Sequence, residues 1–136
     1  MKNKEAVVSQ FQYQTPVITS WNFIVNNDYD SLDINGVNMP IQYTVSKRRE
    51  KYIGNVTLKL SIGETNKNMP FYLETTISVM LKWDDSLMEH IDQLLQENAV
   101  TLLLSYLRPV IAQFTSYAGL APFNLPFLDV RGSIEK

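Results

Sequence analysis

The feature that most constrains the fold of this chain is a predicted helix near its end with apolar residues on two sides. The first apolar stripe has the three- and four-residue spacing of one helix face and comprises Val100, Leu103, Leu104, Leu107, Ile111, Phe114 and Ala118. A second stripe beside it comprises Leu102, Tyr106, Val110 and Tyr117. Such a helix has more apolar surface to bury than one sheet can cover. We therefore expect the first stripe, including Leu107 and Phe114, to lie in the core. Leu102, Tyr106 and Val110 are expected to form an interface between copies of the chain.

Upstream of the helix, four segments alternate apolar and polar residues with the period of two that half-buried strands show. The predicted strands are Val17 to Val25, Pro40 to Arg48, Asn55 to Ile62 and Phe71 to Lys82. The alternation is cleanest in the third strand and is disturbed in the first by Ile18 and Ile24. One polar and one apolar face per strand predict an antiparallel sheet covered on one side. Strands followed by helices predict an α+β fold, a four-stranded antiparallel sheet with a long helix packed on one face.

The connections between these elements add further signals. The segment from Asn26 to Met39 is long and polar, so we expect it to cross over the structure. Ser86 followed by Glu89 has the spacing of a capping box and predicts a helix start. A break is expected near Glu97–Asn98, before the long helix. Pro109 either begins that helix or lies inside it, where it would cost about 3 kcal/mol unless packing compensates.

Composition bounds the class of protein. The 136 residues predict a single domain over residues 1–136, with 1–14 flexible and 131–136 a short tail. A net charge of -2 argues against nucleic acid as a partner, because phosphate binding relies on clustered lysine and arginine. The absence of cysteine excludes thiolate metal sites and thiol nucleophiles. We expect no membrane insertion and a cytoplasmic location, because the sequence has no long apolar run and no secretory signal.

Residues that carry catalytic or metal chemistry are sparse. His90 is the one histidine, and we expect it on the solvated face of an amphipathic helix. The run with Asp28, Asp30 and Asp33 lacks the glycine and glutamate that a calcium loop needs at its sixth and twelfth positions. The basic run Lys47–Lys51 is expected to be a charged hairpin tip. We therefore predict that the protein is not an enzyme and holds no metal or cofactor.

Four short segments follow one another along the predicted strands and helix: Leu58–Glu64, Phe71–Glu74, Leu103–Arg108 and Ala121–Pro126. Together they resemble the SecB family of protein-export chaperones. The first two are similar to that family's strand ending in a Leu-Gly-Glu-type turn and to its Phe-Leu-x-Glu strand. The last two are similar to its Leu-Phe-Pro-Tyr-x-Arg helix start and its Pro-x-Leu-Asn-Leu-x-Pro loop. The likeness extends roughly from Thr15 to Val130.

The resemblance implies an ATP-independent holdase, a cytoplasmic chaperone that keeps preproteins unfolded for export. It implies a homotetramer, built as a dimer of dimers, whose helices are sandwiched between the sheets of neighbouring subunits. Unfolded clients would lie in apolar grooves, because exposed apolar surface binds any unfolded chain through area. The matching residues here are Trp21, Phe23, Leu32, Ile34, Tyr117, Leu120, Phe123, Leu125 and Phe127. Each of them is equally compatible with the core or with a subunit interface.

The chain departs from the family where the translocase motor would dock. The family's last helix and Cys-rich zinc tail have no counterpart after Val130, and its acidic docking residues of the first strand fall on Ser20 and Ile24. Only Tyr72 and Glu74 match the docking patch, which argues against coupling to the motor. A SecB-like chaperone without that coupling would serve another client, such as an antitoxin.

Two other classes of function stay open at this point. The protein would be a small-molecule-binding α+β protein if the sheet and the long helix enclosed an apolar pocket. It would be a plain interaction module if it had a single dedicated client.

Overall fold

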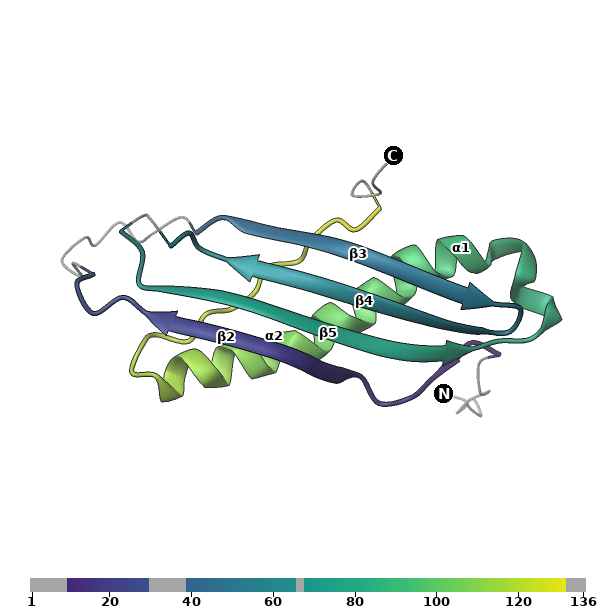
Figure 1. The fold of residues 1–136 in the computed structure, drawn as a ribbon, viewed down its shortest axis with the longest axis horizontal. Helices are drawn as coiled ribbons and strands as arrows, with labels where there is room; N and C mark the ends of the chain where they lie inside the picture. Colours follow the sequence, from purple (N-terminus) through teal and green to yellow (C-terminus); the bar gives the residue numbers. More distant parts are fainter. Residues whose placement is uncertain (1–9, 30–38, 66–67, 132–136) are drawn as a thin grey trace, which may run out of the picture.

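The computed structural model describes residues 10–29, 39–65 and 68–131. In chain order its elements are β1 (Gln12–Tyr13), β2 (Val17–Val25), β3 (Ile41–Glu50), β4 (Ile53–Ile62), β5 (Phe71–Lys82), the 3-10 helix η1 (Asp85–His90), α1 (Ile91–Leu94), the π-helical turn η2 (Leu95–Ala99) and α2 (Val100–Tyr117). The strands form one antiparallel sheet, and the long helix crosses one of its faces (Figure 1). The α+β fold predicted from the sequence is confirmed.

β5 is the strand on which the rest of the sheet is built. It pairs with β4 along one side, and on the other side it pairs with β2 and, at its end, with β1. β3 pairs with β4, so β3 and β2 lie at opposite edges of the sheet. The connection from β2 to β3 therefore passes from one edge to the other, as its length predicted. Its residues 30–38 lie outside the described part of the chain.

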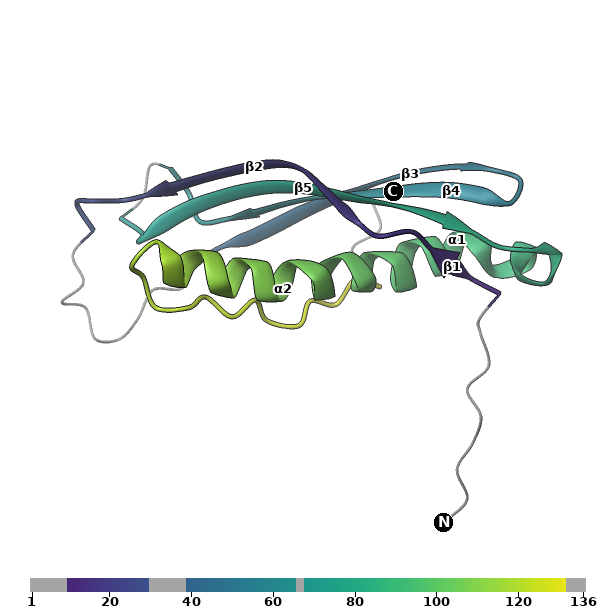
Figure 2. The same cartoon turned by 90° about the horizontal axis from the view of Figure 1, so that it is seen from below.

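The core lies between one face of the sheet and α2. The buried apolar side chains of its two inner strands include Val56, Leu58, Leu60, Ile62, Leu73, Ile77 and Val79. The residues of α2 in the same cluster include Val100, Leu103, Leu107 and Ile111. Burying each such side chain stabilises the fold by about 1.5–3 kcal/mol. Figure 2 shows α2 running beneath the sheet, and no described element covers the other face.

A β-bulge explains the disturbed alternation of β2. The register shifts between Ile18 and Ser20, so one extra residue enters the strand there. Before the shift, Ile18 lies opposite the buried Ile77 and Val17 lies on the open face of the sheet. After it, the odd-numbered residues face α2 and Ile24 is exposed on the open face.

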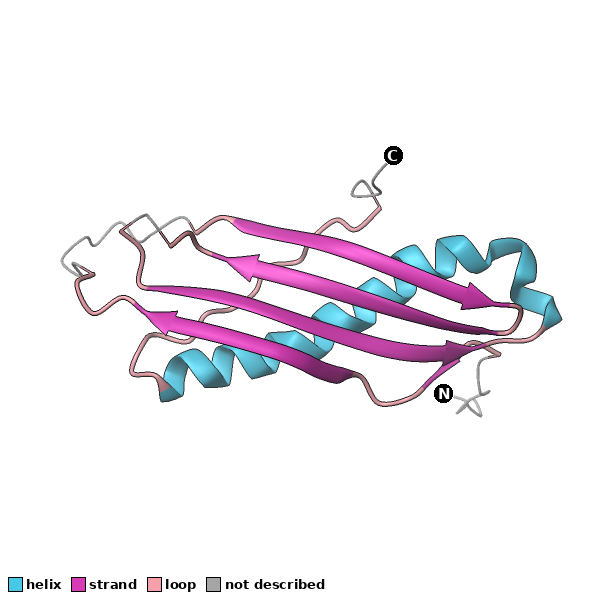
Figure 3. Ribbon diagram, viewed as in Figure 1, coloured by secondary structure: helices cyan, strands magenta, loops and turns pink. Residues whose placement is uncertain are grey.

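The N-cap of the helical region and the break expected within it both differ from the prediction. The N-cap of η1 is Asp84, whose side chain accepts a hydrogen bond from the Ser86 N–H at 3.0 Å, so the capping box of Ser86 and Glu89 was wrong. An aspartate side chain satisfies the unpaired N–H groups of a helix start as well as serine does. The break expected near Glu97–Asn98 is the wider turn η2 instead, and the helical elements follow one another without interruption (Figure 3).

Pro109 lies inside α2 and does not begin it. A proline removes the hydrogen bond to the carbonyl of the residue four positions earlier, here Ser105. Ser105 and Pro109 are both exposed, so that carbonyl lies on the side of the helix that is open to water. Packing on the opposite side keeps the helix continuous.

The strand β1 was not predicted, because residues 1–14 were expected to be flexible. Gln12 and Tyr13 pair with Lys82 and Leu81 at the end of β5. Phe11 packs near Trp83 with ring centroids 6.4 Å apart. A two-residue strand is too short for an alternating pattern to reveal it.

Two glycines with positive φ provide a matched test of the fold. Gly63 (φ 87°) joins β4 to the next turn, and Gly119 (φ 85°) follows α2. Replacing either by alanine should cost about 1–2 kcal/mol for the left-handed backbone. A Cβ on Gly63 would also lie 2.7 Å from the Phe71 carbonyl oxygen, whereas a Cβ on Gly119 would meet nothing within 4 Å. Urea unfolding should show a larger loss for Gly63→Ala than for Gly119→Ala, and equal losses would contradict the structure.

Candidate functional site

The helix α2 has three different sides. One side packs on the sheet through the buried stripe around Leu103 and Leu107. A second side, which includes Arg108 and Thr115, is hydrogen-bonded to the segment that follows the helix. The third side faces away from both and carries the second predicted stripe. The expected two-sided apolar helix is therefore present, and one apolar side of it is left partly exposed by the described residues.

This third side, called here the open stripe, comprises Leu102, Tyr106, Val110 and Tyr117. Leu102 and Val110 are half-buried, Tyr106 is exposed, and Tyr117 is 82 % exposed. A hydrogen bond with the side chain of Tyr13 raises the pKa of Tyr106 above its ordinary value. The open stripe offers apolar surface to another molecule without any rearrangement of the protomer.

The residues after the helix, called here the C-terminal segment (residues 118–131), run back along α2 (Figure 2). Their apolar side chains are the anchors, and Leu125 is 3 % exposed. Leu125 was predicted to contact clients, but its burial places it in the core of the protomer instead. The half-buried residues Leu120 and Phe123 lie earlier in the same segment.

Polar side chains of α2 satisfy the backbone of the C-terminal segment. The Arg108 guanidinium donates from Nε to the Leu125 carbonyl at 3.0 Å and from Nη2 to the Pro126 carbonyl at 3.2 Å. The Thr115 hydroxyl donates to the Ile111 carbonyl and accepts from the Phe123 N–H at 2.9 Å. These bonds replace a strand partner, because an extended segment otherwise leaves its backbone groups unpaired.

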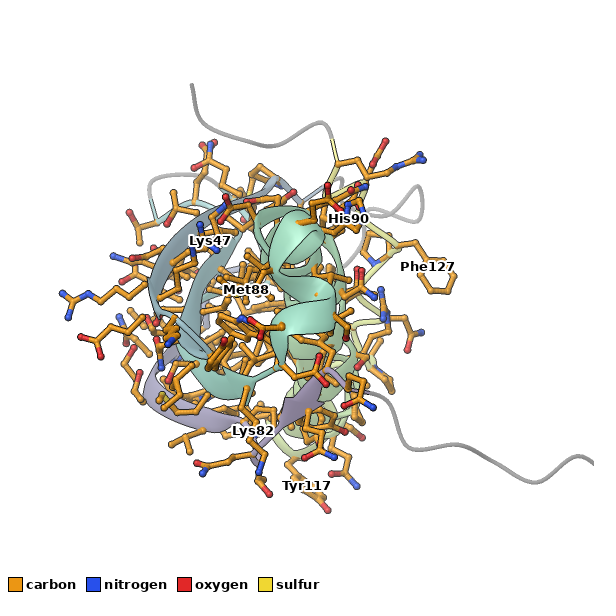
Figure 4. The ribbon with its side chains drawn as sticks, turned by 90° about the vertical axis from the view of Figure 1, so that its right-hand side faces the viewer. Lys47, Lys82, Met88, His90, Tyr117 and Phe127 are labelled. Atoms are coloured by element: carbon orange, nitrogen blue, oxygen red, sulfur yellow. The ribbon has the colours of Figure 1, made fainter. Side chains whose placement is uncertain are left out.

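Phe127 is exposed to solvent, and its ring contacts the guanidinium of Arg108. Its ring centroid lies 4.6 Å from the Arg108 guanidinium carbon, a cation–π contact. The side chain is 92 % exposed and points away from the body of the molecule, as Tyr117 also does (Figure 4). Sequence reasoning did not assign a role to Arg108. The sequence feature that could have indicated this role is that Arg108 is the one charged residue of α2.

Five aromatic residues form a continuous row from β2 to the C-terminal segment. The ring centroids are 5.1 Å apart for Trp21 and Phe114, 4.8 Å for Phe114 and Phe23, 5.2 Å for Phe23 and Phe71, and 5.6 Å for Phe71 and Phe123. The row brings together three residues predicted separately for client contact, Trp21, Phe23 and Phe123. Phe114 was predicted to be in the core, but it is exposed because β2 is the edge strand beneath it.

A hollow of about 420 Å³ opens at the end of the aromatic row. Phe71 and Phe123 line it together with Pro70, Leu120 and Met39. None of the described residues that line it carries a charge. The described ends of the β2–β3 connection also reach this hollow, whereas the predicted contacts Leu32 and Ile34 lie outside the described residues.

A larger hollow of about 620 Å³ lies elsewhere, between η2 and the end of the C-terminal segment. Its lining includes three charged side chains, those of Glu97, Asp129 and Arg131. An extended apolar segment bound in this hollow would bury these charged side chains without partners, which costs free energy. The smaller hollow is therefore the better candidate for an apolar ligand.

The two residues predicted for motor docking, Tyr72 and Glu74, lie together on the open face of the sheet. The Tyr72 hydroxyl donates to Glu74 Oε2 at 3.0 Å, and this hydrogen bond raises the pKa of Tyr72. Lys59 Nζ lies 3.5 Å from Glu74 Oε1. The carboxylate of Glu74 thus already has two neighbours within the protomer.

Groups with catalytic or metal-binding chemistry are scattered. His90 is exposed at the end of η1. Within residues 10–29, 39–65 and 68–131, no group of three or more histidine or acidic side chains could hold a metal ion. None of the described helices is long and apolar enough to cross a membrane.

The comparisons with known proteins give an informative likeness by fold. No protein-family model matches the sequence, and no curated protein matches it either. The SecB-like chaperone Rv1957 of Mycobacterium tuberculosis, solved in complex with a ChAD peptide from the HigA1 antitoxin Rv1956, superposes with a TM-score of 0.69. The match covers 87% of this chain and 90% of that chain at 13% sequence identity. The chain has a SecB-like fold.

The resemblance drawn from four short motifs is therefore confirmed at the level of the SecB-like fold. A protein of unknown function from Streptococcus agalactiae also aligns, over 86% of this chain and 97% of that one at 15% identity, with a TM-score of 0.49. At 13% identity to Rv1957 the fold is shared although few side chains are, so the roles of individual residues have to be argued from their own surroundings.

The hydrogen bonds of Arg108 predict how firmly the C-terminal segment is held. Arg108→Met keeps the length and helix propensity of the side chain but leaves the Leu125 and Pro126 carbonyls without their donors. Hydrogen bonds to a charged group are each worth about 1.5–3 kcal/mol. The Phe123 amide, which donates to the Thr115 hydroxyl, should exchange with deuterium at least about tenfold faster in this variant because the segment opens more often.

The control for this experiment is Arg131→Gln, which removes only an exposed ion pair with Asp129. Unchanged exchange in Arg108→Met, or the same change in both variants, would show that Arg108 does not hold the segment.

Proposed function

We propose that this protein is an ATP-independent chaperone of the holdase type, which binds extended apolar segments of unfolded proteins on the helix side of its sheet. The observation that carries the proposal is the uncharged hollow at Phe71 and Phe123, continuous with the aromatic row. The SecB-like fold supports it, as does a solved relative by fold that was captured with a peptide. The proposed client contacts are Trp21, Phe23, Leu120, Phe123, Tyr117 and Phe127. Leu32 and Ile34 also belong to the proposed contacts.

The size of the hollow fits weak and repeated binding. An aromatic side chain buries about 150–250 Å², and burial gains roughly 25 cal/mol per Å². One or two such side chains would therefore contribute roughly 4–12 kcal/mol to binding. The loss of translational and rotational freedom on association costs about 4–15 kcal/mol and offsets most of this gain. A single hollow holds a client only loosely, so firm holding requires several hollows on one assembly.

Self-association through the part of the open stripe without Tyr117 would supply that assembly. We propose that Leu102, Tyr106 and Val110 pack against a second copy, in a dimer of dimers. Light scattering after gel filtration should give the mass of a tetramer for the wild type and a lower mass for Tyr106→Asp, because a charge would be buried in the interface. Ser116→Asp, exposed elsewhere on α2, is the control and should keep the wild-type mass.

A monomeric wild type would contradict this part of the proposal. A monomer with a co-purifying lipid-like ligand would favour the small-molecule alternative instead.

Client binding is tested by the two most exposed aromatic residues, Tyr117 and Phe127. The double variant Tyr117→Ser with Phe127→Ser removes apolar surface that the fold does not need, so its unfolding midpoint should stay unchanged. Its capacity to suppress aggregation of an unrelated denatured protein, without ATP, should fall several-fold because two desolvated aromatic anchors are lost.

Gln42→Ser on the open face of the sheet is the control for this assay and should keep full capacity. Full capacity in the double variant, or none in the wild type, would refute the holdase proposal.

A second candidate is a chaperone dedicated to one antitoxin. The structure of Rv1957 with its antitoxin peptide favours this possibility. Binding of a single antitoxin segment, with no suppression of general aggregation, would favour it over the holdase.

A further inference from the structure

The open face of the sheet carries an apolar patch at one end that the chaperone function does not use. Most side chains on this face are polar or charged. Ile24 is exposed at the far end of β2, and at this end of the face the apolar exceptions are Val17, Ile53 and Met80, which are 57%, 54% and 41% exposed. These three residues are called here the sheet-end patch.

The strand register brings the patch residues together. Met80 of β5 lies opposite Asn55, two residues along β4 from Ile53, so Met80 and Ile53 are diagonal neighbours on one face. Val17 pairs with Ser78, the next residue of β5 on that face, because of the bulge in β2. The patch therefore runs diagonally across three strands.

Hollows lie on both sides of the patch and share its residues Ile53 and Met80. One, of about 390 Å³, has Lys82 as its charged lining residue, and the other, of about 370 Å³, is lined by Arg48, Arg49 and Glu50. Arg49 forms an ion pair with Asp92 at 3.4 Å. Neither Arg48 nor Lys82 forms an ion pair with any residue in the described ranges. The surroundings of the patch thus carry an excess of positive charge.

We propose that the sheet-end patch docks a partner protein through a segment in which carboxylate side chains flank aliphatic ones. The aliphatic side chains would cover Ile53 and Met80, and the carboxylates would pair with Lys82 and Arg48. Charge complementarity makes this contact selective, whereas the helix-side hollow has uncharged walls and takes apolar segments generally. The two sites lie on opposite faces of the sheet, so the proposal does not depend on the holdase function.

The charges argue against a second copy as the occupant. A symmetric contact would place the same patch on both sides of the interface. Each copy would then present the same excess of positive charge to the other, which is unfavourable. A partner that carries carboxylates would not be repelled in this way.

The test uses the full chain and two labelled peptides of equal length. The acidic peptide alternates glutamate with leucine and isoleucine, and the basic peptide has lysine in place of each glutamate. Fluorescence anisotropy should show binding of the acidic peptide to the wild type and at least about tenfold weaker binding to Ile53→Thr and to Lys82→Glu. The double variant Arg48→Glu with Lys82→Glu should bind the basic peptide in preference to the acidic one.

Two further measurements separate this proposal from its competitors. Thr44→Glu, on the same face but away from the patch, should bind the acidic peptide as the wild type does. Suppression of aggregation should be unaffected by the patch variants, so failure of this proposal is distinguishable from failure of the holdase function.

Four results would overturn the proposal. They are no binding of the acidic peptide to the wild type, equal weakening in Thr44→Glu, loss of binding in the Tyr117→Ser, Phe127→Ser variant, and a lower oligomeric mass in Ile53→Thr. The last result would identify the patch as an interface between copies.

Discussion

The packing of α2 on one face of β4 and β5 is the interaction on which the rest of the structure depends. It buries the first apolar stripe of the helix against side chains from both inner strands. A sheet contacts only one side of a helix, so the remaining apolar side chains of α2 need other cover. The C-terminal segment supplies it on the second side, and the described residues leave the third side partly exposed. The surplus of apolar surface is thus a consequence of the helix sequence and the shape of a sheet.

The C-terminal segment shows how this protein holds an extended chain. It has no strand partner among the described residues, and its backbone is satisfied by Arg108 and Thr115 of α2. Its apolar side chains pack beside the helix at separate positions, and Leu125 is 3% exposed. An unfolded client is also an extended chain with spaced apolar side chains, so the proposed binding mode has a counterpart within the fold itself.

Sequence patterns predicted the parts of the fold that obey one periodicity. The limits of β5 agree with the predicted strand, because burial on one face imposes a period of two over its full length. The limits of β2 also agree, although the bulge between Ile18 and Ser20 interrupts its period. β1 was missed since two residues show no period. The start of the helical region was misassigned because several polar residues near Asp84 can cap a helix, and sequence alone does not tell which one does.

The candidate site was predictable only in part, because burial in irregular segments depends on tertiary contacts. Trp21, Phe23 and Phe123 were predicted separately, and the structure joins them through Phe71 and Phe114. Leu125 and Phe127 are two residues apart and looked alike in the sequence. Leu125 is buried and Phe127 is exposed, because Arg108 hydrogen-bonds the carbonyls of Leu125 and Pro126 and its guanidinium packs on the Phe127 ring.

Tryptophan fluorescence shows whether the apolar surface on the helix side receives unfolded chains. The chain has two tryptophans, and Trp21 stands in the aromatic row whereas Trp83 is buried near β1. Titration with an unfolded protein that lacks tryptophan, in the absence of ATP, should shift the emission of the wild type to the blue as Trp21 loses water. Trp21→Phe should show no shift while still binding. An unchanged wild-type spectrum at saturating client would contradict the account.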